Sequence, residues 1–95
     1  MKIQKFEDII AGQKSQDLVV SIYKEFKLAR DLGFRDQIFR VSVAISNNIA
    51  EGFGRRSKAD FARFLLIALA SCSEVRSMLY LAVRLEYMSP KIQKV

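Results

Sequence analysis

The sequence predicts an all-α protein of long helices, three of full length and a fourth that is truncated or very short. Apolar residues recur at spacings of three and four in long segments, which is typical of amphipathic helices. Only one proline and four glycines interrupt the 95 residues, and 51% of them are hydrophobic, enough to form a core. At this length we expect one domain, residues 1–95.

The first predicted helix covers about residues 6–32. Its apolar residues share one face: Phe6, Ile9, Ile10, Leu18, Ile22, Phe26 and Ala29. Gly12 lies inside this segment and weakens the helix by about 1 kcal/mol relative to alanine. The helix is expected to end at Leu32-Gly33-Phe34, where Gly33 would adopt the left-handed conformation.

The second predicted helix covers about residues 36–51, with Asp36 as its N-cap. It carries two apolar stripes, so we expect burial on two sides. The first stripe is Ile38, Val41, Ile45 and Ile49, and the second is Phe39, Val43 and Ala50.

A structural corner follows, within the segment Ser46–Arg56 (SNNIAEGFGRR). Gly52 is expected to end the helix, and Gly52 and Gly54 to turn the chain. Asn48 and Glu51 are three residues apart and share a helix face. They could bind a ligand, but buried carboxylates are usually paired. We therefore favour a polar network that fixes the corner, with Arg40 or Arg55 as the partner of Glu51.

The third predicted helix covers about residues 57–87 and begins at Ser57, which resembles a capping box with Asp60. Phe64–Cys72 is apolar all round, which predicts packing partners on opposite sides. Ser89-Pro90 indicates the start of a fourth helix at residue 90. Because two turns cannot cover the length of the third helix, we expect an exposed apolar strip and a dependence on oligomerisation.

The composition argues against an enzyme. The chain has no histidine, so His-based acid–base catalysis and His-ligated metals are excluded. Cys72 lies among apolar residues, where a structural thiol is the favoured interpretation. No glycine-rich loop leads into a phosphate-binding Gly-Lys-Ser/Thr motif. We expect a non-enzymatic protein without metal or cofactor.

The net charge of +6 indicates an acidic partner, although a solvated basic surface is an equally good explanation. Arg55, Arg56, Lys58 and Arg63 form a cluster in which Asp60 is the only acid. The N-terminus of the third helix lies beside them and adds backbone N–H groups. This arrangement predicts phosphate contacts. Further candidate contacts are Arg30, Arg35 and Arg40.

The location predicted from the sequence is the cytoplasm, with no membrane partner. Cys72 is the only cysteine, which suits a reducing compartment, and no signal peptide is recognisable. The longest uncharged runs, Val41–Ala50 and Phe64–Ser73, have ten residues each. A membrane span needs roughly 18 apolar residues.

A set of residues from Phe6 to about Met88 resembles a known four-helix-bundle family. The most specific part is Asn48-Ile49-Ala50-Glu51-Gly52-Phe53-Gly54-Arg55, and the remaining matches are Gln37, Arg40, Ser46, Phe61, Phe64, Leu65, Ile67, Ala68, Ser71, Glu74, Leu85 and Tyr87. That family contains the proteins encoded in intervening sequences of bacterial 23S ribosomal RNA genes. It also contains the accessory variability protein of diversity-generating retroelements.

The resemblance implies an antiparallel (up-down) four-helix bundle, here with its fourth helix truncated or very short. It also implies that the bundles assemble into a barrel-shaped homopentamer that binds RNA or DNA through basic surfaces. In the retroelement branch it also implies a reverse transcriptase as protein partner. Our first hypothesis is therefore a non-enzymatic accessory protein whose ring-shaped oligomer contacts nucleic-acid phosphates. The alternative is a protein-interaction scaffold that docks a partner such as a retroelement reverse transcriptase.

Overall fold

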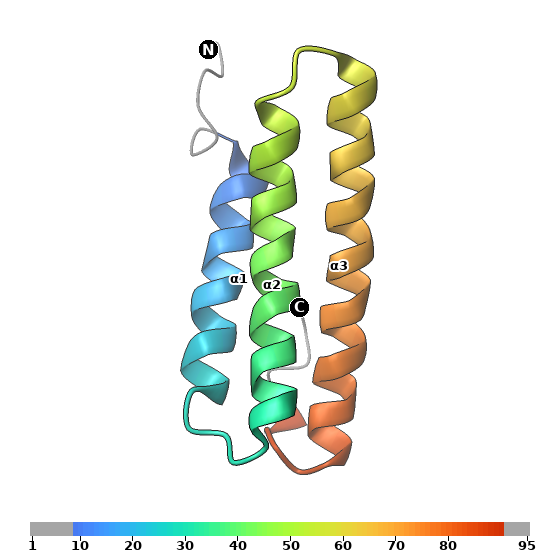
Figure 1. The fold of residues 1–95 in the computed structure, drawn as a ribbon. Coiled ribbons are helices and arrows are strands. Elements are labelled where there is room, and N and C mark those ends of the chain that lie inside the picture. The colour runs from blue at the N-terminus through green and yellow to red at the C-terminus, as the bar shows by residue number, and fades with distance from the viewer. Residues whose placement is uncertain (1–8, 91–95) are drawn as a thin grey trace.

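The computed structural model describes residues 9–90, which form three α-helices in sequence order (Figure 1). They are α1 (Ile10–Phe26), α2 (Leu32–Phe53) and α3 (Lys58–Arg84). The helices run alternately up and down, and α2 lies between α1 and α3 and packs against both. The prediction of an all-α protein is confirmed. The predicted fourth helix falls almost entirely on residues outside the described range.

The core forms along α2, which contributes the most buried side chains. Its first predicted stripe is buried as expected, whereas the second is less covered: Phe39 and Ala50 are half-buried and Val43 is exposed. Phe39 stacks on Tyr23 of α1, with ring centroids 5.4 Å apart. The buried hydrophobic residues are Ile22, Phe26, Ile38, Val41, Ile45, Ile49, Ala68, Val75, Leu79, Ala82 and Met88.

The connection between α1 and α2 differs from the prediction. α1 ends at Phe26, not near residue 32, and α2 begins at Leu32 with Asp31 as its N-cap instead of Asp36. The Asp31 carboxylate accepts a hydrogen bond from the Phe34 N–H at 3.0 Å. Gly33 therefore lies in the first turn of α2, where its φ is not positive, and does not terminate α1.

The end of α3 is tied to this connection. The Tyr87 N–H donates to the Ala82 carbonyl at 2.7 Å, and Glu86 has a φ of +62°, which together form a Schellman-type C-cap. The Tyr87 hydroxyl donates to the Asp31 carboxylate at 2.8 Å, across 56 positions of sequence. The Tyr87 ring also packs edge-on against Phe34, with centroids 5.2 Å apart. Phe34 in turn contacts Phe26 at the end of α1, with ring centroids 5.6 Å apart, so the segment after α3 closes the foot of the bundle against α1 and α2.

The opposite corner, between α2 and α3, also differs from the prediction at Gly52. Gly52 is buried inside α2, which continues to Phe53 and has Gly54 as its C-cap. Neither glycine has positive φ. A Cβ atom built on Gly52 would lie 2.8 Å from the Phe64 Cβ. Gly52 is therefore required for the close approach of α3 and not for a turn.

α3 is buried on the face that contacts α2, and within residues 9–90 no other helix packs against it. Many of its large hydrophobic side chains are exposed, as is that of its C-cap, Leu85. Those within the helix are Leu65, Leu66, Ile67, Leu69, Tyr80 and Leu81. Of the packing partners predicted on opposite sides of this helix, the described residues provide one, which is α2. An open apolar hollow of about 300 Å³ lies between α1, α2 and α3 and is lined by Ala11, Lys14, Ser15, Leu18, Ile45, Ile49 and Cys72.

By length and composition alone, α3 is also apolar enough to cross a membrane. An 18-residue stretch has a mean hydropathy of 1.5 and is 22% buried. The stretch includes Glu74 and Arg76, so it extends beyond the uncharged run Phe64–Ser73 on which the prediction of no membrane span was based. Core helices of soluble proteins can be equally long and apolar, so a single helix of this kind is weak evidence for a membrane span.

Candidate nucleic-acid interface

Four cations gather at the connection between α2 and α3: Arg55, Arg56, Lys58 and Arg63, called the basic corner below. Gly54 caps α2, so Arg55 and Arg56 lie in the short loop that follows. The Ser57 hydroxyl accepts a hydrogen bond from the Asp60 N–H at 3.0 Å and starts α3, as predicted. All four cationic side chains are exposed.

Arg55 is held in place by two contacts. Its guanidinium donates to the Glu51 carboxylate at 2.6 Å, and its central carbon lies 4.9 Å from the centroid of the Phe64 ring. Glu51 thus pairs with Arg55, one of its two predicted partners. Both side chains are substantially exposed, so the pair is a surface ion pair and not a buried network. Asn48 does not join it, because its amide donates to the Ala44 carbonyl at 2.8 Å.

Arg63 approaches the same ring from α3. Its guanidinium carbon lies 5.0 Å from the Phe64 centroid, and one of its nitrogens lies 3.8 Å from the Asp60 carboxylate. Two guanidinium groups therefore lie close to the Phe64 ring, whose negative face attracts them. Exposed ion pairs contribute about 0–1 kcal/mol, so these contacts orient the two arginines more than they stabilise the fold.

The uncompensated positive charge of the basic corner lies on Arg56 and Lys58. Neither side chain forms an ion pair with any described residue. Both flank the N-terminus of α3, where the first backbone N–H groups have no carbonyl partner within the helix and favour an anion. Arg56 and Lys58 are therefore the best placed of the predicted residues to meet a phosphate.

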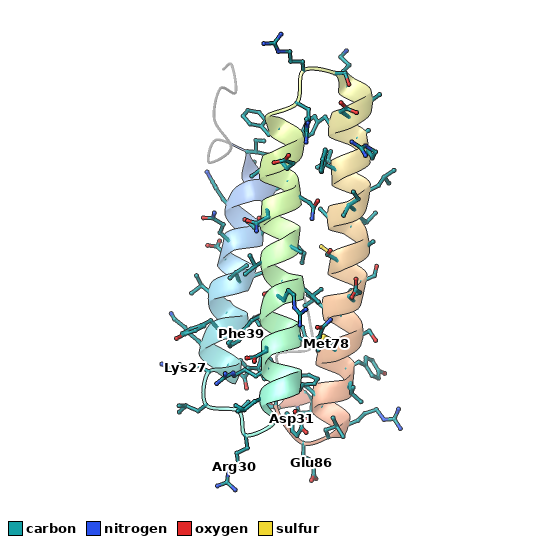
Figure 2. The ribbon with its side chains drawn as sticks, in the orientation of Figure 1. Lys27, Arg30, Asp31, Phe39, Met78 and Glu86 are labelled. Atoms are coloured by element: carbon teal, nitrogen blue, oxygen red, sulfur yellow. The ribbon has the colours of Figure 1, made fainter. Side chains whose placement is uncertain are left out.

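The other predicted cations do not join the basic corner. Arg30 lies at the foot of the bundle, beside Asp31 and far from the connection between α2 and α3 (Figure 2). Arg35 is close to that end and pairs with Asp36 at 3.1 Å. Arg40 is exposed on α2. Because the molecule is 43 Å long, the seven candidates cannot contact one compact ligand.

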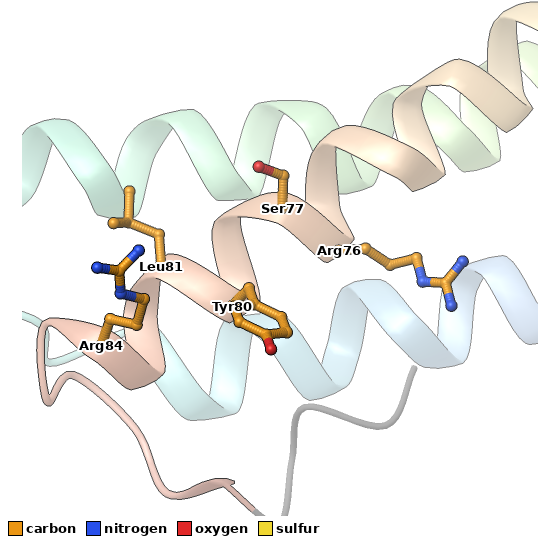
Figure 3. Close-up of a pocket in the computed structure, with 5 residues that line it drawn as sticks. All are labelled: Arg76, Ser77, Tyr80, Leu81 and Arg84. Atoms are coloured by element: carbon orange, nitrogen blue, oxygen red, sulfur yellow. The ribbon is translucent and has the colours of Figure 1, made fainter.

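One basic and aromatic face was not recognised in the sequence. Arg76, Ser77, Tyr80, Leu81 and Arg84 line an open hollow of about 540 Å³ on α3 (Figure 3). The four-residue spacing of Arg76, Tyr80 and Arg84 within a helix would have indicated a shared side of that helix.

Among residues 9–90, no three His, Cys, Asp or Glu side chains lie close enough to hold a metal ion. Partial burial raises the pKa of the Cys72 thiol, and the positive charge of Arg76 opposes this only in part. The thiol is therefore kept protonated at neutral pH, which does not favour a nucleophile.

The comparison with protein families gives a match over residues 7–95 to the family described as 23S rRNA-intervening sequence protein. Because this match covers nearly all of the chain, the protein belongs to that family. The family agrees with the ribosomal-RNA part of the sequence resemblance; the retroelement link stays a prediction. A comparison with curated proteins gives no match.

Proposed function

We propose that this member of the 23S rRNA-intervening sequence protein family is a non-enzymatic, cytoplasmic protein that binds nucleic acid through the basic corner. The observation that carries the proposal is the pair of uncompensated cations, Arg56 and Lys58, at the N-terminus of α3. Arg55 and Arg63, oriented by Phe64, extend the same surface. The net charge of +6 adds a long-range attraction for polyanions.

We further propose that the protein acts as a ring-shaped homo-oligomer, with five copies as the number that the resemblance implies. The support is the apolar surface of α3, where Leu66 and Leu69 are 65% and 61% exposed. Exposed apolar faces of this kind usually mark contacts with other chains. A closed ring would repeat the basic corner around its axis, and several weak phosphate contacts would then act together.

The test is fluorescence anisotropy with structured RNA and duplex DNA over a salt series, with light scattering on the same samples. The variant is Arg56→Glu combined with Lys58→Glu. The matched control, Lys24→Glu with Lys27→Glu, makes the same change in charge at the C-terminal end of α1, which lies at the opposite end of the bundle from the basic corner (Figure 1). Loss of each phosphate contact lowers the slope of log K against log salt by about 1.

We expect the basic-corner variant to lose affinity and salt dependence, and the control to retain both. Equal losses in the two variants would mean that only total charge matters and would contradict the assignment of the site. No binding by the unmodified protein at low salt would overturn the proposal as a whole.

The second candidate is a protein-interaction scaffold that docks a partner such as a retroelement reverse transcriptase. The exposed apolar face of α3 favours it, because a different protein could bind to such a face as readily as another copy of this chain. A monomer that binds no nucleic acid would support this candidate. A neighbouring gene for a reverse transcriptase, with template and variable repeats, would support it further, whereas a position inside a ribosomal RNA operon would support the first.

A further inference from the structure

The face of α3 around Tyr80 combines an open aromatic ring with two uncompensated cations. Arg76, Tyr80 and Arg84 follow one another at four-residue intervals, and Tyr80 lies between the two arginines (Figure 3). Tyr80 is 62% exposed. Neither arginine forms an ion pair with the part of the chain that the structure describes.

The Tyr80 ring is available to a ligand. Other exposed aromatic rings are already engaged, as Tyr23 is by Phe39 and Tyr87 by Phe34. Within residues 9–90, Tyr80 makes no aromatic or cation–π contact. The hollow of about 540 Å³ beside it is open to solvent and is also lined by Leu81, which adds an apolar contact.

The spacing of the three side chains suits an extended polyanion. At about 1.5 Å of rise per residue, Arg76 and Arg84 are separated by about 12 Å along the helix axis, with Tyr80 midway. A chain of phosphates that runs along α3 could contact both guanidinium groups. A base carried between those phosphates would then lie over the tyrosine ring.

We propose that this face binds single-stranded nucleic acid, with one unpaired base stacked on Tyr80 and the flanking phosphates held by Arg76 and Arg84. Aromatic rings beside cations are the usual means by which proteins bind single strands without reading their sequence. A duplex cannot use the ring, because its bases are already stacked on one another. The inference rests on the proposed function for the class of ligand, but it uses a surface separate from the basic corner.

The experiment compares a labelled single-stranded RNA of mixed sequence with the duplex RNA formed by the same strand, using the full chain. Stacking of one base contributes about 1–3 kcal/mol by alanine substitution, so Tyr80→Ala should weaken single-strand binding about 5- to 150-fold. Duplex binding should change less than about two-fold. Tyr80→Phe, which keeps the ring, should retain most of the single-strand affinity.

Two further variants make the test specific to this face. Leu28→Ala removes an exposed apolar side chain in the connection between α1 and α2, away from α3, and it should not alter single-strand affinity. Arg76→Gln with Arg84→Gln should lower the salt slope for single strands by about 1.4, or about 0.7 for each phosphate contact. Far-UV circular dichroism and light scattering of each variant establish that fold and assembly are retained.

The outcomes separate this inference from the proposed function. If the Arg56→Glu, Lys58→Glu variant loses affinity while Tyr80→Ala binds single strands normally, the stacking face is refuted and the basic corner stands. If Tyr80→Ala changes the size of the oligomer without a selective loss of single-strand binding, the face is a protein contact and the inference is overturned. If the unmodified protein binds neither RNA, both proposals fail.

Discussion

Replacing Gly52 by alanine should destabilise this bundle, although alanine is the better helix former. Gly52 lies within α2 at a helical backbone conformation, so the substitution should improve helix propensity by about 1 kcal/mol. The opposing effect comes from the packing of α2 against the first turns of α3. The added methyl group would lie 2.8 Å from the Phe64 Cβ, 3.0 Å from the Phe61 Cδ1 and 3.3 Å from the Phe61 carbonyl oxygen.

These distances decide the sign of the effect. Carbon atoms in good contact are about 3.5–4.0 Å apart, so the methyl group would be too close by more than half an ångström. The Phe64 Cβ and the Phe61 carbonyl cannot rotate away, because they move only with the backbone of α3. Overpacking of this kind costs about 1–3 kcal/mol. After the propensity term is subtracted, we expect a net loss of about 1 kcal/mol in the free energy of unfolding.

Urea unfolding followed by far-UV circular dichroism, at one fixed protein concentration, measures this loss. The matched control is Gly54→Ala, whose methyl group would meet only the Glu51 and Ala50 carbonyls at 3.6 and 3.8 Å. Gly54 has a φ of −77°, which alanine adopts without strain, so this variant should be stabilised by about 0.5–1 kcal/mol. A Gly52→Ala protein as stable as the unmodified protein would refute the packing argument.

Three other predictions concern the helix ends, each measured from urea unfolding. Ser57→Ala removes the acceptor of the Asp60 N–H and should cost about 1 kcal/mol; an unchanged unfolding free energy would show that the cap is dispensable. Glu86 has a left-handed backbone conformation, which glycine adopts without strain, so Glu86→Gly should raise the free energy of unfolding by about 1 kcal/mol. A destabilised variant would contradict the presence of strain at this residue. Hydrogen bonds from the Phe34 N–H and from Tyr87 lower the pKa of Asp31, and the bond to Asp31 together with desolvation raises the pKa of Tyr87. The contact between Tyr87 and Asp31 should therefore stabilise the fold from above pH 3.8 to about pH 10.0. Its contribution should be lost as pH falls through the lowered pKa of Asp31 or rises through the raised pKa of Tyr87. Tyr87→Phe removes this contribution, and an identical pH profile of stability in that variant would contradict the prediction.

The helices themselves could be predicted from the sequence, because apolar periodicity and the Ser57 cap are local signals. The connection between α1 and α2 could not. Its sequence offers two possible caps, Asp31 and Asp36, separated by a glycine that resembles a helix end. Asp31 is also the residue that Tyr87 reaches from 56 positions away. A choice that involves such a distant contact has no local signal, and the prediction failed there.

The same distinction applies to the candidate site. Clustering of Arg55, Arg56, Lys58 and Arg63 is visible in the sequence, and so is one of the ion pairs that compensate its charge. The four-residue spacing of Glu51 and Arg55 indicates their pairing. The position of Phe64 between Arg55 and Arg63 depends on how closely α3 approaches α2, which only the structure shows.

Packing contacts orient part of the basic corner. Gly52 allows α3 to approach α2, and this approach brings the Phe64 ring to the guanidinium group of Arg55. Phe64 in turn lies against Arg63, so two cations take their orientation from a packing contact and not from a ligand. Arg56 and Lys58 have no such contacts with the described residues, and their charges stay uncompensated there. The corner thus combines two oriented cations with two uncompensated ones, and the proposed contact with phosphates rests on this arrangement.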